Sequence, residues 1–192
     1  MGRRYDHTPD ALRNLILDTA EAIVEKKGLQ CLTARKIGTK IGYSVGTLYH
    51  SFKNLDDIKV HLRHRTLEAL LETLETARRA TTKPEEAPFT MGHAYLQFVR
   101  KHSNAWRTIL ESRLEEYPDW YLKTIQSILS CVKEGLRPSW KKSDSELDKM
   151  VVMTWAALQG LAVLSDYRKI TLTSAYSESE LLESFLKAII SS

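Results

Sequence analysis

The side chains best suited to chemistry lie close together, within one stretch near the start of the chain. Their groups suit the phosphates and base edges of DNA, and they are Thr33, Arg35, Lys36, Ser44, Val45, Gly46, Thr47, Tyr49, His50 and Lys53. In the first turn of a short helix starting at Val45, the Thr47 side chain offers a hydroxyl to a base edge. Val45 can contact the methyl group of thymine. Gly46 leaves room there for close approach, and Arg35 and Lys36 can each supply a guanine or a phosphate contact.

Each of these residues also has a structural role open to it. Thr33 can be a helix cap alone, or a cap that also touches phosphate. Tyr49 can pack on the preceding helix, or extend its hydroxyl to a phosphate. His50 is expected to face outward, because Leu48 and Phe52 take the inward positions of the same short helix.

Other candidate sites are weaker. His61, His64 and Glu68 share one helix face, but a metal site needs further converging ligands, so a solvated face is favoured. Cys31 and Cys131 are favoured as buried, inert thiols over redox sensors. The sequence contains no Gly-x-Ser-x-Gly, Walker loop, His-Glu-x-x-His or Cys-x-x-Cys pattern. We therefore expect no catalytic site, metal or cofactor.

Composition and charge narrow the class of protein. The 192 residues are 43% apolar and 27% charged, with only eight Gly and five Pro, which argues against an all-β or disordered chain. The net charge of +4 lies entirely in residues 1–54, which points to a nucleic-acid-facing end. No run of about 18 apolar residues and no apolar N-terminal region is present, so we expect a cytoplasmic protein without a membrane span.

The positioning elements are expected to be helices. A helix over 9–27 has Thr8 as its cap and Gly28 as its stop. Two short helices, over 34–41 and 45–51, follow caps at Thr33 and Ser44 and are separated by Gly42. This is a helix-turn-helix pattern above a first supporting helix.

The remainder of the chain is also expected to be helical. A long helix is predicted over 55–80, a linker over 81–88 and a loop over 170–177. Further helices are predicted near 89–101, 103–115, 118–136, 144–168 and 178–191. The predicted fold is all-α, with a helix-turn-helix domain over 1–54 and a helical bundle over 55–192.

The run from Leu32 to Asn54 resembles the DNA-binding domain of the TetR family of transcriptional regulators. The resemblance covers about residues 12–60 and rests on Thr33, the Ile37–Gly42 frame, the Gly46-Thr47-Leu48-Tyr49 run and Phe52. It implies an all-α chain of about nine helices, a homodimer, operator DNA as partner and a ligand cavity in the C-terminal bundle. It also implies DNA contacts at Thr33, Arg35, Thr47, Tyr49 and His50.

Three residues depart from the family pattern. Gly38 replaces the usual Ala and is expected to loosen its helix by up to about 1 kcal/mol. Ser51 stands where an aromatic residue or His is common. Leu55 replaces a Lys that meets phosphate, so we expect Lys53, Lys59 or the helix amides to substitute for that contact.

The last two predicted helices can form the dimer interface. The helix over 144–168 is apolar on nearly all sides, and Ala156, Ala157 and Gly160 permit close approach. Packed against their copies, these helices give the four-helix interface of the family. The stretch Trp155–Ala162 also resembles a Trp-x-x-x-His-Gly motif, with Gln159 in place of the His.

An aromatic middle region suggests either plain core or a cavity for a small molecule. The candidate lining residues are Phe98, His102, Trp106, Leu110, Tyr121, Thr124, Met153, Thr154 and Gln159. No dense charge cluster accompanies them, which favours an apolar or aromatic ligand.

Two functions remain open at this point. The first is a repressor that a small, largely apolar molecule releases from a pseudo-palindromic operator. The second is a DNA-bound adaptor that recruits a protein partner without a small ligand. A pocket with polar anchors would favour the first, and a filled interior with an exposed apolar patch would favour the second.

Overall fold

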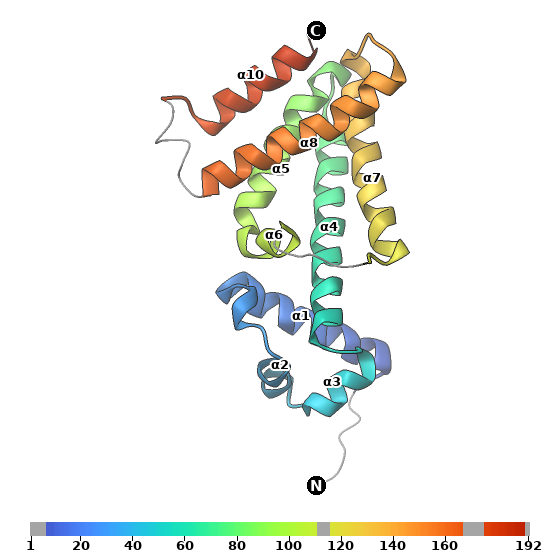
Figure 1. Cartoon of the computed structure of the whole chain (residues 1–192), viewed down its shortest axis with the longest axis vertical. Helices are drawn as coiled ribbons and strands as arrows, with labels where there is room; N and C mark the ends of the chain where they lie inside the picture. Colours follow the sequence, from blue (N-terminus) through green and yellow to red (C-terminus); the bar gives the residue numbers. More distant parts are fainter. Residues whose placement is uncertain (1–6, 111–115, 167–174, 191–192) are drawn as a thin grey trace. The chain divides into compact units, whose positions relative to one another are not determined.

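The computed structural model describes residues 7–110, 116–166 and 175–190, and these residues form helices with no strand (Figure 1). The helices are α1 (Pro9–Lys27), α2 (Ala34–Ile41), α3 (Val45–Ser51), α4 (Leu55–Ala80), α5 (Ala87–Lys101), α6 (Ser103–Leu110), α7 (Asp119–Leu136), α8 (Asp144–Asp166) and α10 (Glu178–Ile190). Short 3-10 turns cover Leu29–Cys31, Pro84–Glu86 and Arg137–Ser139. The all-α prediction is confirmed. The loop predicted over 170–177 lies mostly outside the described residues.

The first four helices begin and end where the sequence predicts, because their boundaries are set locally. The hydroxyls of Thr8, Thr33 and Ser44 each accept a hydrogen bond from a backbone amide three residues later, at 3.3, 3.2 and 3.1 Å. At the other ends, Gly28 and Gly42 adopt positive φ values of 77° and 75°. The caps and the glycine stops thus set these helix boundaries through contacts within a few residues.

Gly38 has a different role from the one expected. A Cβ atom at this position would lie 2.6 Å from the carbonyl oxygen of Tyr43, closer than real Cβ contacts. The Tyr43 amide donates to the Gly38 carbonyl at 3.0 Å, which draws the turn onto the helix. The glycine therefore permits the tight turn between α2 and α3, rather than only weakening α2.

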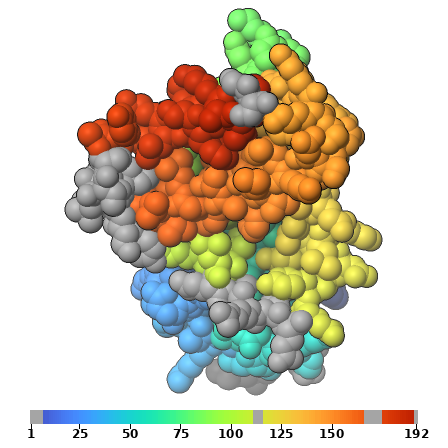
Figure 2. All heavy atoms as spheres, turned by 45° about the horizontal axis from the view of Figure 1, so that its top comes forward, coloured from blue at the N-terminus to red at the C-terminus, as the bar shows by residue number. Residues whose placement is uncertain are grey.

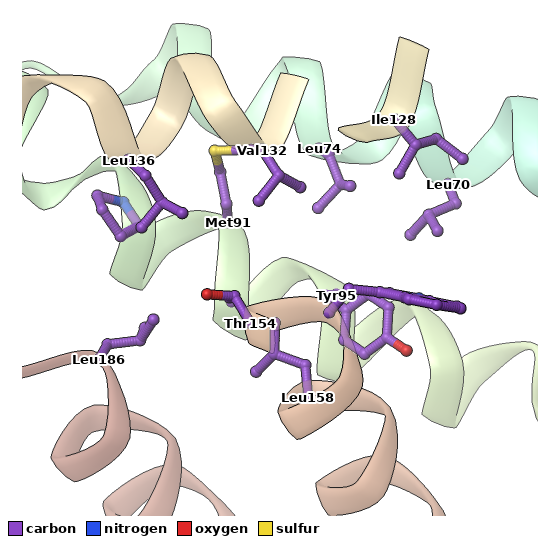
Figure 3. Close-up of a pocket in the computed structure, with 13 residues that line it drawn as sticks. Leu70, Leu74, Met91, Tyr95, Ile128, Val132, Leu136, Thr154, Leu158 and Leu186 are labelled. Carbon is purple, nitrogen blue, oxygen red and sulfur yellow. The ribbon is translucent and has the colours of Figure 1, made fainter. Parts of the chain in front are cut away.

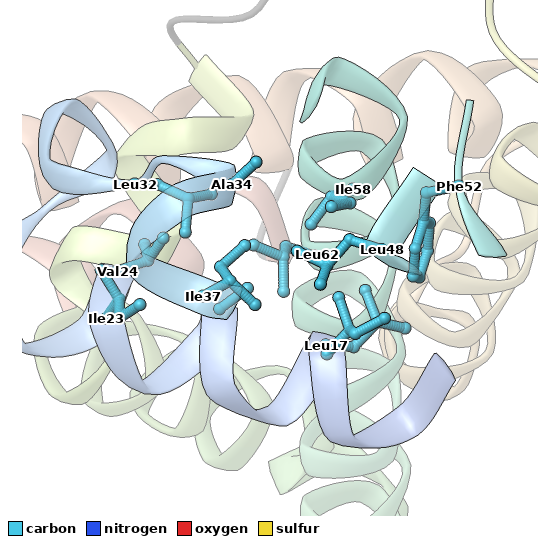
Figure 4. Packing of buried hydrophobic residues seen from close by; sticks show 12 residues of the cluster. Leu17, Ile23, Val24, Leu32, Ala34, Ile37, Leu48, Phe52, Ile58 and Leu62 are labelled. Carbon is cyan, nitrogen blue, oxygen red and sulfur yellow. The ribbon is translucent and has the colours of Figure 1, made fainter. Parts of the chain in front are cut away.

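The chain divides into two compact units. The first joins residues 1–66 to 102–114, and the second joins 67–101 to 115–192, so α4 contributes to both. The first unit has a continuous apolar core (Figure 4), which consists of Ile16, Leu17, Ala20, Ile23, Val24, Leu32, Ala34, Ile37, Leu48, Phe52, Ile58 and Leu62. This core joins α1, α2 and α3 to the start of α4.

Helix α6 belongs to the first unit, which periodicity along the chain does not reveal. Its Asn104 side chain donates to the Glu25 carbonyl at the end of α1, at 2.9 Å. His102, just before α6, lies 2.9 Å from the Glu25 carboxylate. The buried Arg63 of α4 donates through Nε to the Thr108 carbonyl of α6, also at 2.9 Å. Polar contacts therefore hold α6 to both α1 and α4.

The second unit packs α5 against α7, α8 and α10. Helix α8 is long and apolar enough over Asp144–Ser165 to cross a membrane by length and composition, a test that core helices also pass. Only part of its apolar surface is buried within the chain: Leu147 and Val151 are buried, but Val152 and Leu164 are exposed by 51% and 44%. The remaining apolar surface of α8 is thus open to a partner.

Candidate nucleic-acid interface and apolar cavity

Helix α3 presents a mixed outward face and a single apolar inward face. Leu48 is fully buried against α1 and α4, and Phe52 closes the end of the helix. On the other side, Val45 and Tyr49 are exposed by 36% and 41%, and His50 is also exposed. The outward orientation expected for His50 is the one observed, and Tyr49, for which packing on the preceding helix was the alternative, is also exposed. This exposed face gives α3 the form of a recognition helix.

The hydroxyls at the start of α3 are already engaged. Ser44 Oγ accepts from the Thr47 amide at 3.1 Å and lies 2.9 Å from Thr47 Oγ1. Beside them, Gly46 has open space above its Cα, because a Cβ atom there would have only Ser44 Oγ nearby, at 3.7 Å. The Thr47 hydroxyl is thus held in the first turn, and a base edge can approach over Gly46.

Helix α2 supplies the second group of candidates. Thr33 is exposed and caps α2 through its hydroxyl, so its capping role is observed. Arg35 is exposed in the first turn. Lys36 extends its ammonium group back to the Cys31 carbonyl at 2.9 Å. Lys36 must leave that carbonyl before it can contact DNA, whereas Arg35 is directly accessible.

The start of α4 shows which of the groups expected to substitute for the missing lysine at Leu55 are already engaged. Asn54 Oδ1 accepts from the Asp57 amide at 2.8 Å, and Asp57 Oδ2 accepts from the Lys53 amide at 2.9 Å. Lys59 pairs with Asp56 at 2.7 Å, and this pairing lowers the pKa of the Asp56 carboxyl. Two amides and one ammonium group are thus already engaged. Of the expected substitutes, the Lys53 side chain is exposed, and it remains the candidate for this phosphate contact.

The second unit contains a small apolar cavity of about 40 Å³ (Figure 3). Its lining comes from four long helices and α10, and consists of Leu70, Leu74, Pro88, Met91, Gly92, Tyr95, Ile128, Val132, Leu136, Thr154, Trp155, Leu158 and Leu186. Tyr95 is buried and donates its hydroxyl to Gln159 Oε1 at 2.6 Å. Burial raises the pKa of the Tyr95 phenol, so it remains a neutral donor.

One polar atom in this lining has no hydrogen bond within the described part of the chain. Thr154 is buried, and its Oγ1 atom faces no donor or acceptor there. An unsatisfied buried hydroxyl costs free energy that a ligand carbonyl or hydroxyl group could recover. Thr154 is therefore a candidate polar anchor for a ligand in this cavity.

The predicted cavity residues are only partly brought together. Thr154 lines the cavity, and Gln159 reaches it through Tyr95. Phe98, Tyr121 and Thr124 belong to the same unit but not to the lining, and Met153 is 59% exposed. The other three, His102, Trp106 and Leu110, belong to the first unit. The leucines of α4, and Tyr95 itself, were not among the predicted lining residues.

Replacing Thr154 with Val tests the unsatisfied hydroxyl. Thr154→Val keeps the shape of the side chain and removes the polar atom, so the free energy of unfolding should rise by about 1 kcal/mol. Chemical denaturation of the two proteins measures this difference. A lower unfolding free energy in the variant would mean that the hydroxyl has a partner, such as a bound water.

The remaining candidates are the metal-ligating side chains and the two cysteine thiols. Among the described residues, no group of three or more His, Cys, Asp or Glu side chains is placed to hold a metal ion. Cys31 is half-buried and Cys131 is buried. Burial raises the pKa of the Cys131 thiol, against a smaller effect of Arg78 that lowers it. A protonated, buried thiol is a poor nucleophile.

The sequence analysis missed Arg13. This α1 residue donates to the last carbonyl of α3 and contacts His61 of α4, each at 2.6 Å. A lone arginine among the polar residues of an amphipathic helix gives no sequence signal for such a role. Only the meeting of three helices shows it.

Comparison with known proteins agrees with this geometry. The family model described as "Bacterial regulatory proteins, tetR family" matches residues 16–58. No curated protein matches the sequence. A solved protein of unknown function from Rhodococcus sp. RHA1 is 16% identical, with 98% of this chain and 97% of that chain covered and a TM-score of 0.81.

Two solved regulators have the same fold. The TetR family transcriptional regulator PfmR from Thermus thermophilus is 18% identical, with 91% and 96% of the two chains covered and a TM-score of 0.63. The fatty acid degradation regulator FadR from Bacillus halodurans is 16% identical, with 93% and 94% covered and a TM-score of 0.67. Residues 16–58 therefore match the tetR family model, and the chain has the fold of the solved TetR family transcriptional regulator PfmR.

Proposed function

We propose that this chain is a repressor that binds a pseudo-palindromic operator and leaves it when a small, largely apolar molecule binds. Residues 1–54 would bind DNA, and residues 55–192 would bind the effector and dimerise. The observation that carries the DNA-binding part is the outward face of the capped helix α3, with Val45, Thr47, Tyr49 and His50 around the open Gly46. The excess of positive charge in residues 1–54 supports it.

The active form is a homodimer in this proposal. Val152, Ala156, Gly160 and Leu164 recur every four residues on the exposed side of α8. A Cβ at Gly160 would meet nothing within 4 Å. Figure 2 shows α8 and α10, in orange and red, side by side on one surface. A second copy of this face would cover the exposed apolar side chains and let the two α8 helices approach closely.

The effector would enter the cavity beside Thr154. Ligand pockets generally have volumes of roughly 300–1,000 Å³, so the present cavity of about 40 Å³ is too small for such a ligand. An effector must bind an expanded state of the bundle more tightly than this state. Leu70 and Leu74 line the cavity, and Ile58 and Leu62 of the same helix belong to the core of the first unit. A shift of α4 would therefore affect both.

The adaptor function is the less favoured alternative. The unsatisfied Thr154 hydroxyl inside the apolar cavity suits a small ligand with one hydrogen-bonding group. The exposed apolar face of α8, which an adaptor could present to a protein partner, is assigned here to the second copy of the chain. If a dimer covers this face of α8, the face is no longer available for an adaptor to present to a protein partner.

Selection of duplexes from a random-sequence pool tests the DNA-binding proposal. The full chain should enrich a pseudo-palindrome with half-sites about 34–36 Å apart, or a multiple of that spacing. It should bind with two chains per duplex and with a steep salt dependence. Equal affinity for all sequences would contradict the proposal. The enriched duplex then becomes the probe for effectors that release it.

A further inference from the structure

Arg13 joins the recognition helix to α1 and α4 in one place. Its Nη1 atom donates to the carbonyl of Ser51, the last residue of α3, at 2.6 Å. Its Nη2 atom lies 2.6 Å from Nε2 of His61 on α4. The guanidinium carbon lies 4.2 Å from the centroid of the Phe52 ring. One side chain thus contacts the end of α3 through a hydrogen bond and a cation–π contact.

These contacts matter because α3 is only seven residues long. The last carbonyls of a helix have no partner within the helix, and a cation there is favoured by the helix dipole. The Arg13 guanidinium supplies both the donor and the charge. Because isolated helices this short are unstable in water, such outside contacts fix its position.

The protonation state of His61 decides whether the hydrogen bond between Arg13 and α4 can form. Arginine only donates hydrogen bonds, so Nε2 of His61 must accept, which requires a neutral ring with its proton on Nδ1. Asp57 Oδ1 lies 3.6 Å from the same Nε2 atom. A protonated Nε2 would repel Arg13 and donate to Asp57, whose other oxygen accepts from the Lys53 amide.

The groups around His61 favour the neutral form. Burial and the Arg13 cation lower the pKa of the imidazole below its ordinary 6.5, Asp57 opposes them, and His64 and Arg65 add smaller lowering effects. Arg65 itself is paired with Asp18 of α1 at 2.6 Å. The folded state thus binds fewer protons here than the unfolded state, so this contribution is complete above pH 6.5 and falls as the pH drops below it.

We propose that Arg13 is a positioning residue for DNA binding, which sets the recognition helix against α1 and α4, and that protonation of His61 releases it. The proposal rests on the proposed operator binding, but it adds a device within the first unit that works without effector. It predicts that selective affinity declines as the pH falls.

The DNA experiment uses the full chain and a duplex that the wild-type protein selects at about pH 8. Arg13→Lys keeps the charge but cannot bridge two acceptors as a planar fork does. It should lower affinity for the selected duplex about tenfold, with affinity for unrelated duplexes unchanged. His61→Gln keeps an acceptor that does not titrate, so its affinity should depend much less on pH than that of the wild type.

The matched control is His64→Gln, on the same helix face, which should keep the decline in affinity with falling pH and only move it to a slightly higher pH, because His64 lowers the pKa of His61. Wild-type selective affinity for Arg13→Lys, or a wild-type pH profile for His61→Gln, would overturn the proposal.

Hydrogen exchange of the Leu48 and Phe52 amides provides a readout without DNA. Protection relative to the intrinsic exchange rate at the same pH should be lower in Arg13→Lys, and should fall in the wild type as the pH drops below 6.5 but not in His61→Gln. If exchange is unchanged in Arg13→Lys, the positioning role is refuted, whether or not the protein selects a duplex. If exchange changes as expected but the wild-type protein selects no duplex, only operator binding is refuted.

Discussion

Gly46→Glu is expected to abolish selective DNA binding without unfolding the protein. Gly46 lies in the exposed first turn of α3, and a Cβ there meets only Ser44 Oγ, at an ordinary 3.7 Å. Glutamate also has a higher helix propensity than glycine, so the substitution should not destabilise α3. The new carboxylate would face phosphates and block the approach of a base edge. We expect the affinity to fall about 100-fold or more, since each lost base contact costs roughly 1–3 kcal/mol.

Gly46→Gln is the matched control for this prediction. Glutamine has the shape of glutamate without its charge. The difference in affinity between the two variants therefore separates electrostatic repulsion of the phosphates from steric crowding of the base edge. Affinity for the selected duplex and for an unrelated duplex would be measured by titration at several salt concentrations. Raised salt should restore part of the binding of the Glu variant, because screening weakens its repulsion. Wild-type affinity in both variants would mean that α3 does not enter the groove.

The DNA-facing part of the fold could be predicted from the sequence because its signals are local. Thr33 and Ser44 cap the helices that follow them, and Gly42 ends α2 in a left-handed conformation. The inward positions of Ile37 and Leu48 follow from helical spacing alone. Each signal spans only a few residues, so no knowledge of the distant chain is needed.

The cavity could not be predicted in the same way because its lining depends on tertiary packing. Trp106 and Tyr95 are similar as sequence signals, since both are aromatic residues on amphipathic helices. Trp106 lies on α6, which packs in the first unit, whereas Tyr95 lines the cavity in the second. Which aromatic residue faces the cavity is decided by how α5 and α6 pair with other helices, and spacing along the chain does not specify that pairing.

The apolar character of α8 shows a related limit. Its sequence is apolar on nearly all sides, which is consistent with burial on more than one side or with a membrane-spanning helix. The structure separates the two faces: Leu147, Val151 and Thr154 are buried within the chain, and Val152 and Trp155 are exposed. The exposed face can be explained by a second copy of the chain, and the next prediction tests this directly.

Gly160→Arg is expected to convert the proposed dimer to a monomer that still folds. A Cβ at Gly160 meets nothing within 4 Å, so the chain itself can accommodate a long side chain. In a dimer with closely approaching α8 helices, two arginines would face each other at the interface. The monomer would engage only one half-site, which should lower affinity for the selected duplex on the order of 10²–10⁴-fold.

Ser127→Arg is the control for Gly160→Arg, because Ser127 is exposed on α7 and receives the same change in charge. Sedimentation or light scattering would give the mass of each variant, and thermal unfolding would confirm that both fold. A Gly160→Arg dimer with wild-type affinity would place the interface elsewhere. A monomer with wild-type affinity would separate dimerisation from operator binding, and the α8 face would then be open to the partner protein that the adaptor function requires.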